Sequence, residues 1–294
     1  MPHPTATHQT LATTAVHHYP GIGSWSVETI PLIVLLGFSA AYIYAYRRAR
    51  RHSEKVGLSY LIPYFTGILL IALALFSPID PIGDQYLLSV HMVQHLLLQD
   101  IAPAFLILGL RSPLLPLGLP KAVLRAIAPG GRFGKVRNLL TNPWFALGLW
   151  AAVTWGWNWP AAFDYSASHP LVHDLEHITL FYAGLTLWWV VIDPLPSGRL
   201  RPNGFRLAIL GASRLASAGV CIPLTWLPRV EYPLYASAPR AYGLSALSDQ
   251  ALGGAAMCFT EFLVFGIAFV AVFISVLNRS DAVDRLGELA AGSR

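Results

Sequence analysis

The sequence has few charged residues: Asp, Glu, Lys and Arg make up 12% of its 294 residues. Soluble domains carry about 25% charged residues, so this chain cannot cover a soluble globule of its size with polar surface. Hydrophobic residues make up 55%, and the mean hydropathy is +0.53. The scarcity of charge therefore excludes an ordinary soluble domain and predicts that most of the outer surface faces lipid.

Cysteine is also scarce, since the chain has only Cys221 and Cys258. Both fall in apolar runs, so neither indicates a redox compartment. The first 24 residues lack the basic and apolar regions of a signal peptide. We expect residues 1–24 to form a short flexible tail rich in His, Thr and Pro. The sequence contains no internal repeat and no separate soluble domain.

What the sequence does contain is a series of apolar runs of about 20 residues, the length that crosses a bilayer. We predict an all-α fold, a polytopic transmembrane bundle that covers residues 25–278 and ends in a short cytoplasmic tail, 279–294. The bundle has seven predicted helices, near residues 25–46, 58–78, 86–110, 143–160, 170–193, 205–226 and 249–277.

The distribution of basic residues predicts the orientation of this bundle. Of the 20 Lys and Arg residues, 17 lie in loops or tails on one side, and only Arg229 and Arg240 lie on the other. Because cytoplasmic loops carry an excess of Lys and Arg, we predict that the N-terminus is outside and the C-terminus is in the cytoplasm. Topology thus accounts for the net charge of +5, and we expect no nucleic-acid partner, only membrane lipid around the helices.

Histidines in the third and fifth predicted helices form the clearest candidate site. His91 and His95 are four residues apart, as are His173 and His177, so each pair shares one helix face. Both helices run from outside to inside, which places the two pairs at a similar depth in the outer third of the membrane. Ionisable groups there are costly and are usually functional, and imidazole suits Cu, Zn, Fe and Ni. The pattern predicts that these histidines form one metal-binding group. His169, four residues before His173, extends it to the outer boundary of the fifth predicted helix.

The last predicted helix adds further candidate ligands. Asp249 lies at its outer end, level with His91 and His173, and Met257 and Cys258 lie deeper. Thioether and thiolate groups select Cu(I), although ordinary core packing is the alternative role for Met257 and Cys258.

Two other charged residues in the predicted helices have predicted partners. Arg214 is an isolated charge in the sixth predicted helix, and we expect Asp100 or Glu261 to pair with it in a structural role. Glu176, next to His177, is suited to orient a metal-bound histidine through a hydrogen bond.

Three separated segments resemble the signature segments of a known family: HMVQHLLLQDIAPAFLILG, HDLEHITLF followed by WW, and SDQALGGAAM. They are similar to the CtaG family of cytochrome c oxidase assembly factors of the caa(3) type, and the resemblance covers about residues 58 to 275. The matching residues are His91, Met92, His95, His173, His177 and Asp249.

This resemblance implies a protein that is not an enzyme and that acts in the maturation of haem–copper oxidases. It implies copper as the bound metal, delivered to or inserted into the oxidase. The implied partners are the copper-receiving subunits of cytochrome c oxidase and a periplasmic copper donor. The implied location is the bacterial inner (plasma) membrane.

Two other functions use the same histidines. A membrane diiron oxidase or hydroxylase also carries paired HxxxH motifs, but usually about eight histidines, often as HxxHH, on the cytoplasmic side. Here no HxxHH or HExxH occurs, and the candidate site faces outward. A haem b membrane protein with axial histidines from facing helices is the other alternative.

Overall fold

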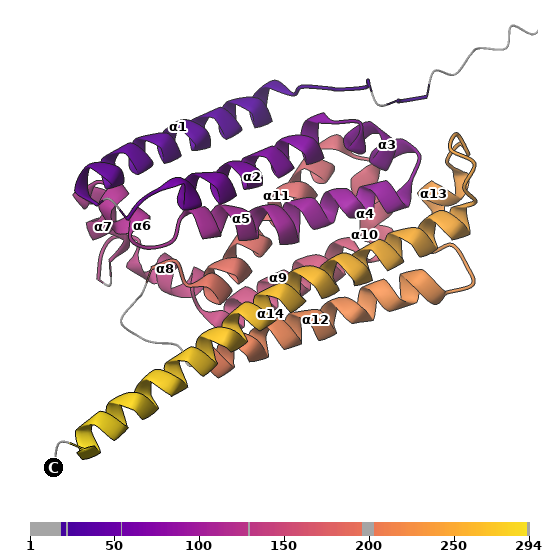
Figure 1. Ribbon diagram of the computed structural model, residues 1–294. Coiled ribbons are helices and arrows are strands. Elements are labelled where there is room, and N and C mark those ends of the chain that lie inside the picture. The colour runs from indigo at the N-terminus through magenta and orange to yellow at the C-terminus, as the bar shows by residue number, and fades with distance from the viewer. Residues whose placement is uncertain (1–18, 22, 54, 129, 196–202, 293–294) are drawn as a thin grey trace, which may run out of the picture.

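The computed structural model describes residues 19–292, apart from Ile22, Glu54, Pro129 and residues 196–202. The side chains of Asn203 and of residues 279–292 are likewise not described. Within the described residues every regular element is a helix, which confirms the predicted all-α class. The long helices lie side by side in one elongated bundle (Figure 1). The predicted N-terminal tail lies mostly outside the described residues.

Six helices of the described chain are long and apolar enough to cross a membrane. They are α1 (Thr29–His52), α2 (Leu58–Phe76), the composite helix Leu88–Gly109, α11 (Pro170–Ile192), α12 (Asn203–Trp226) and α14 (Ala246–Gly292). The fourth predicted span corresponds to α9 (Pro143–Trp157), which has only 15 residues. It lies within the bundle beside α11 and α12, so the seventh span stays a prediction.

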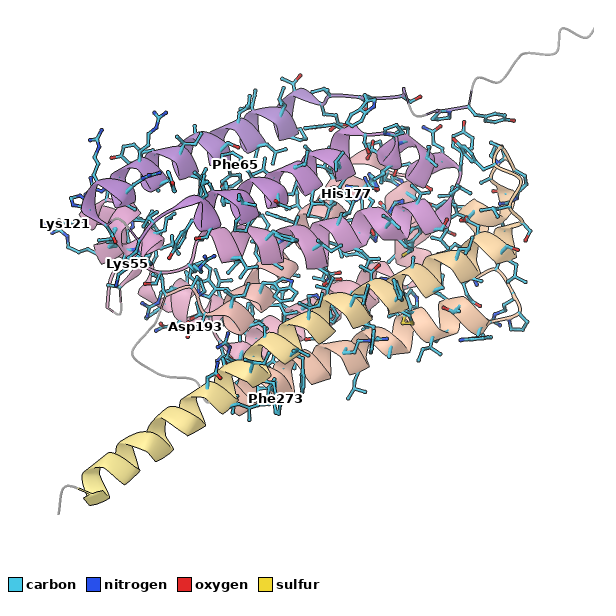
Figure 2. All side chains as sticks on the ribbon, in the orientation of Figure 1. Lys55, Phe65, Lys121, His177, Asp193 and Phe273 are labelled. Atoms are coloured by element: carbon cyan, nitrogen blue, oxygen red, sulfur yellow. A yellow bond between two sulfur atoms is a disulfide. The ribbon has the colours of Figure 1, made fainter. Side chains whose placement is uncertain are left out.

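Short helices close the two ends of the bundle. One end carries α3 (Ile79–Gln85), α10 (Pro160–Ala167) and α13 (Pro233–Ser237). The other end carries α6 (Leu114–Gly118), α7 (Lys121–Ile127) and α8 (Gly134–Leu140). Figure 2 places Lys55 and Lys121 at this second end, as the predicted clustering of basic loops requires. The direction of the bundle across the membrane stays a prediction.

Local sequence explains several helix boundaries. Proline is the first residue of α9, α10, α11 and α13, where its missing N–H costs no hydrogen bond. Asn142 also caps α9, because its side-chain oxygen accepts hydrogen bonds from the Trp144 and Phe145 amides. Asp193 ends α11 in a left-handed conformation, with a φ of 51°. The last helix of the chain, α14, is longer at its C-terminal end than predicted, because it continues past residue 277 to Gly292.

The composite helix Leu88–Gly109 is the centre of the bundle. In its apolar window 72% of the residues are buried, against 22% in each of α1 and α14. It consists of α4 (Leu88–Leu96), a π-helical turn η1 (Leu97–Ile101) and α5 (Ala102–Gly109). π-turns inside α-helices occur frequently at functional sites, and this one begins two residues after His95.

A glycine brings the two histidine-bearing helices together. A Cβ at Gly184 of α11 would collide with the backbone carbonyl oxygen of Gln99 in η1. The missing side chain lets the two backbones approach closely, as small residues do at helix contacts in membranes. This contact fixes α11 against the composite helix just below the histidines.

Candidate metal centre

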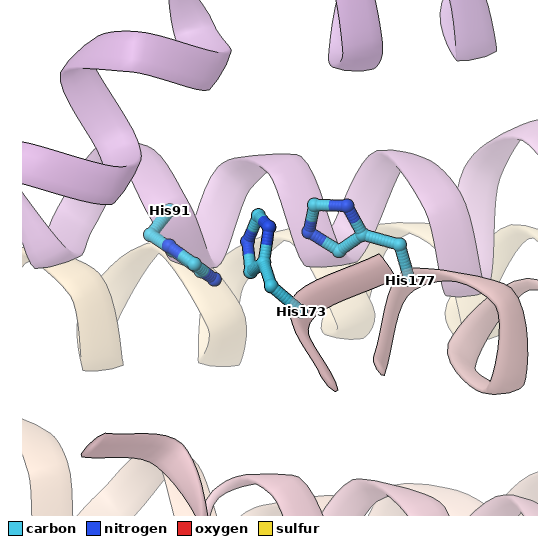
Figure 3. Close-up of side chains that lie close together, drawn as sticks. All are labelled: His91, His173 and His177. Carbon is cyan, nitrogen blue, oxygen red and sulfur yellow. The ribbon is translucent and has the colours of Figure 1, made fainter. Parts of the chain in front are cut away.

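The four predicted histidines come together between α4 and α11. The ring centroids of His91 and His95 are 4.4 Å apart, and those of His173 and His177 are 4.1 Å apart. Across the two helices, the centroids of His91 and His173 are 5.4 Å apart, and those of His95 and His177 are 5.6 Å apart. Figure 3 shows the rings of His91, His173 and His177 side by side in the space between the two helices.

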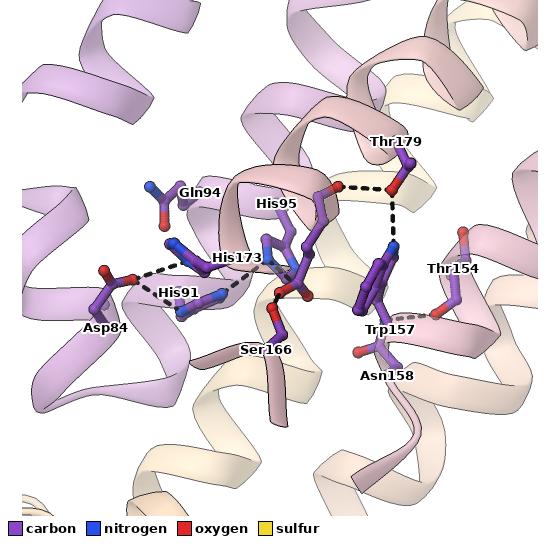
Figure 4. Close-up of polar contacts among 12 residues, drawn as sticks. Asp84, His91, Gln94, His95, Thr154, Trp157, Asn158, Ser166, His173 and Thr179 are labelled. Atoms are coloured by element: carbon purple, nitrogen blue, oxygen red, sulfur yellow. Dashed lines mark hydrogen bonds and ion pairs between the residues drawn. The ribbon is translucent and has the colours of Figure 1, made fainter. Parts of the chain in front are cut away.

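Two carboxylates complete the group. Glu176 Oε1 lies 3.4 Å from His95 Nε2, and its other oxygen accepts a hydrogen bond from the Ser166 hydroxyl of α10. Asp84 of α3 approaches from the outer end, with its Oδ1 3.2 Å from His173 Nε2 and 3.5 Å from His91 Nδ1 (Figure 4). Glu176 thus contacts His95, a histidine of the opposite helix.

The hydrogen bonds around His91 indicate which of its nitrogens carries a proton. Tyr235 of α13 donates its hydroxyl proton to the Gly83 carbonyl oxygen at 2.6 Å. Its oxygen lies 3.1 Å from His91 Nδ1 and therefore accepts from that nitrogen. The proton of a neutral His91 is then on Nδ1, and the lone pair of Nε2 faces His95 Nε2 at 2.8 Å. In this tautomer His91 Nε2 accepts a hydrogen bond from His95 Nε2, and a metal ion that replaces this proton would take up the same lone pair.

Gln94 holds the short helix α3 over the histidines. Its amide nitrogen donates to the Ala74 carbonyl oxygen at 2.9 Å and to Asp80 Oδ1 at 2.8 Å. Burial, together with the negative charge of nearby Asp84, raises the pKa of Asp80 to about 6. The outer end of the site is thus an acidic pair on α3, anchored to α4.

Several buried polar atoms of this group have no hydrogen-bond partner: His95 Nδ1, His173 Nε2, His177 Nε2, Glu176 Oε1 and Asp84 Oδ1. Buried polar groups are nearly always hydrogen-bonded, and each exception requires an explanation. His173 Nε2 lies 3.2 Å from Asp84 Oδ1 and Glu176 Oε1 lies 3.4 Å from His95 Nε2, and unsatisfied ligand atoms gathered in this way are the arrangement that a cation would satisfy.

The spacing of the donor atoms fits a metal ion. Two sets of three have ligand atoms within 4.8 Å of one another: His91, His173 and His177, and His91, His95 and Glu176. Nitrogen ligands bind at about 2 Å, so neighbouring ligands of a tetrahedral ion are roughly 3.3 Å apart. The separations of 2.8 Å and 3.4 Å in the second set are close to that value. Small rotations of the side chains are enough to close either set around an ion.

The structure does not bring every predicted ligand to this group. Asp249 was predicted as a ligand, but its two oxygens accept from the Leu88 and Ser89 amides at 2.7 Å and 3.0 Å, at the start of α4. His169 was also predicted, but it is exposed, hydrogen-bonds the Tyr165 carbonyl at 2.8 Å and stacks on the Tyr165 ring. Both residues stabilise helix ends beside the centre.

The predicted sulfur ligands lie in the apolar core. Met92 and Met257 are buried in a cluster with Phe163, Tyr232 and other side chains of α4, α10, α12 and α14. The prediction of a Cys258 thiolate ligand is wrong, because Cys258 forms a disulfide with Cys221 that joins α14 to α12. Figure 2 shows this sulfur–sulfur bond between the two helices. A cysteine in a disulfide offers no thiolate to copper.

Arg214 pairs with Glu261, one of its two expected partners. Arg214 Nη1 lies 3.8 Å from Glu261 Oε2, and the same carboxylate accepts a hydrogen bond from Ser217. Asp100, the other candidate, accepts from the Trp150 indole at 3.2 Å.

Sequence reasoning missed Asp84, Tyr235 and Ser166, which the structure places around the histidines. Each lies on a short helix outside the predicted spans, and none has a regular spacing from the histidine pairs. Only the tertiary fold brings them to the site.

Comparison with known proteins agrees with this arrangement of motifs. Residues 40–279, more than half of the chain, match the family described as "Cytochrome c oxidase caa3 assembly factor (Caa3_CtaG)". No solved structure matches the chain.

Curated relatives come from mycobacteria. The chain is 27% identical over 235 residues to "Uncharacterized protein Mb0105" of Mycobacterium bovis and to "Uncharacterized protein MT0111" of Mycobacterium tuberculosis. These matches cover 76% of this chain and 34% of each relative, so the chain spans about a third of their length. The family match extends across the histidine helices and the last span, and on this ground the chain belongs to the cytochrome c oxidase caa3 assembly factors.

Proposed function

We propose that this assembly factor binds copper at the group formed by His91, His95, His173, His177 and Glu176 and passes it to a caa3-type oxidase. Family membership supports the role in assembly. The observation that carries the copper step is the buried group of histidines and Glu176, which offers two sets of three ligand atoms within 4.8 Å of one another and contains several atoms without a hydrogen-bond partner. Copper is the cargo of this site, taken up and then released to the oxidase.

The chemistry of the donor set suits a transferable copper ion. Imidazole binds both copper and zinc, and a site of histidines and one carboxylate leaves coordination positions open for ligand exchange. The neutral form of imidazole is the one that binds a metal. The Asp84 carboxylate beside His173 stabilises the bound cation by charge and orients the ring.

The geometry argues against a haem protein. A haem iron held by two histidines needs the flat macrocycle between the two rings. The Nε2 atoms of His91 and His95 are 2.8 Å apart, and the rings across the helices have centroids 5.4 to 6.1 Å apart. This group is compact enough for an ion and too compact for a porphyrin.

The location that fits this function is the bacterial plasma membrane, with the histidines toward the periplasm. The basic residues of the loops support that orientation. A periplasmic copper donor then supplies the ion on the same side. A C-terminal reporter that is active only in the cytoplasm is the expected result, and one active only in the periplasm would overturn the orientation.

Metal analysis of the purified protein tests the copper site. We expect the wild-type protein to bind copper(II) with an electron paramagnetic resonance signal typical of nitrogen ligands. His95→Ala and His177→Ala should each reduce binding sharply while helix content stays normal. His169→Ala is the matched control, because this histidine is exposed and outside the group. If His95→Ala and His177→Ala both bound copper like the wild type, the group would be structural and the proposal would fail.

The oxidase provides the functional measurement. Cells that carry His95→Ala or His177→Ala should assemble an oxidase with a lowered copper content, and the His169→Ala strain should not. If the oxidase had its full copper content in all strains, the histidine group would have no part in supplying copper during oxidase assembly.

A further inference from the structure

The two possible ligand sets overlap in a single residue. His91 belongs both to the set with His173 and His177 and to the set with His95 and Glu176. The Nε2 atom of His91, which carries the lone pair of this ring, lies 2.8 Å from His95 Nε2. One ion can therefore keep its bond to His91 while its other ligands change.

The two sets differ in their access to solvent. His173 is one helical turn closer to the outer end of α11 than His177, and His91 is one turn closer to the outer end of α4 than His95. The His173 side chain is 13% exposed, and Asp84 beside it is 31% exposed. Glu176 is 1% exposed. The first set therefore reaches solvent through His173, whereas the second set is closed by the buried Glu176 and by His95, one turn further along α4.

The two sets also differ in the charge of their ligands and in how closely their spacing already matches that around a metal ion. The outer set offers three imidazoles, whereas the inner set offers two imidazoles and a carboxylate. Ser166 holds Glu176 from the far side, and the inner separations of 2.8 Å and 3.4 Å already approximate those around a tetrahedral ion. A divalent cation gains more from the inner set because of its negative charge and its low accessibility to water.

We propose that the centre holds one metal ion at two alternative positions that share His91. In the outer, exchange position the ligands are His91, His173 and His177, and Asp84 draws the cation in from solution. In the inner, holding position the ligands are His91, His95 and Glu176. This inference rests on the proposed copper function and names how the site loads and releases its cargo, through the Asp84 side of the bundle.

Exchange kinetics distinguish the two positions. The experiment loads the detergent-purified full-length protein with copper(II) chloride and then removes the metal with EDTA. Glu176→Gln should still bind copper but release it to EDTA at least about tenfold faster, the scale on which carboxylate partners affect metal sites. His173→Ala should keep the tightly held copper but load and release it more slowly.

Asp84→Asn tests the outer carboxylate. We expect loading about tenfold slower with an unchanged final stoichiometry, since a carboxylate at the mouth of a site raises the arrival rate of cations by that order. Asp174→Asn is the matched control for both acidic variants, because Asp174 lies on α11 but is exposed. Circular dichroism of each variant checks that the bundle is folded.

The outcomes separate this inference from the proposed function. Equal effects of Glu176→Gln and His173→Ala on both binding and exchange would indicate one undivided site and overturn the two-position scheme. Two copper ions bound at once per chain would also overturn it, in favour of a dinuclear centre. In both cases the copper function would stand. A wild-type protein that binds no copper would overturn the proposed function and this inference together.

Discussion

The bundle contains two groups of ionisable side chains at membrane depth, and they are built in different ways. In the group around Arg214, the Glu261 carboxylate accepts a hydrogen bond from the Ser217 hydroxyl and forms an ion pair with the Arg214 guanidinium. None of these three side chains is among the described buried atoms that lack a hydrogen-bond partner. In the histidine group, several donor and acceptor atoms have none. A group whose charges satisfy one another stabilises the fold, whereas one with unsatisfied ligand atoms is suited to bind an ion.

The largest expected effect on stability comes from breaking the Arg214 pair. Arg214→Ala leaves the Glu261 carboxylate buried without its cation, and we expect a loss of about 3 kcal/mol in the free energy of unfolding. Copper bound per folded molecule should not change. Arg229→Ala is the control, because its ion pair with Glu231 is at the surface and should contribute nothing measurable. A stable Arg214→Ala protein that had lost its copper would contradict the comparison.

Gly184 should be the next most sensitive position. Gly184→Ala places a methyl group against the Gln99 carbonyl oxygen and separates α11 from η1. We expect a loss of about 2 kcal/mol, as for overpacked cores, and weaker copper binding because the two histidine helices move apart. Gly148→Ala in α9 is the control, since a Cβ there meets no atom within 4 Å. Thermal unfolding and copper titration measure both quantities, and equal behaviour of the two variants would show that this contact is not tight.

Asp249→Ala should have a smaller effect. It removes the carboxylate that accepts from the Leu88 and Ser89 amides at the start of α4. Loss of a helix cap costs about 1 kcal/mol. Copper should still bind, with modestly lower affinity, because His91 lies in the first turn of the same helix. Complete loss of copper from a folded Asp249→Ala protein would restore Asp249 as a direct ligand.

The smallest effect should come from the N-terminal tail. Deletion of residues 2–18 removes four histidines, but this segment is polar and offers no apolar face to bury. We expect unchanged expression, thermal stability and copper stoichiometry. Reduced copper in the deletion variant would mean that histidines of the N-terminal segment also take part, which would weaken the contrast between the two buried groups.

Local periodicity explains which parts of the site could be predicted from the sequence. The spacing of four residues fixes the faces of His91 and His95 and of His173 and His177 whatever the packing, and the structure brings both pairs together. Asp249 was placed at the right depth, but depth does not determine toward which neighbour a side chain turns. The Cys221–Cys258 disulfide depends on how α12 and α14 pack, which no spacing within one helix encodes. Asp84 and Tyr235 reach the site only because the short helices α3 and α13 pack against the end of the bundle, so no local sequence pattern could identify them.

The π-turn Leu97–Ile101 sets the rotational phase between the two halves of the composite helix. Each residue turns an α-helix by about 100°, so the wider turn offsets the face of α4 relative to the face of α5. The packing of α5 against α2 anchors the lower half, and the offset then decides where His91 and His95 point. Removal of a single residue from this turn would rotate both imidazoles away from α11 without altering any ligand. The direction in which His91 and His95 point is therefore set by the number of residues in the π-turn below them, and not by the chemical nature of those residues.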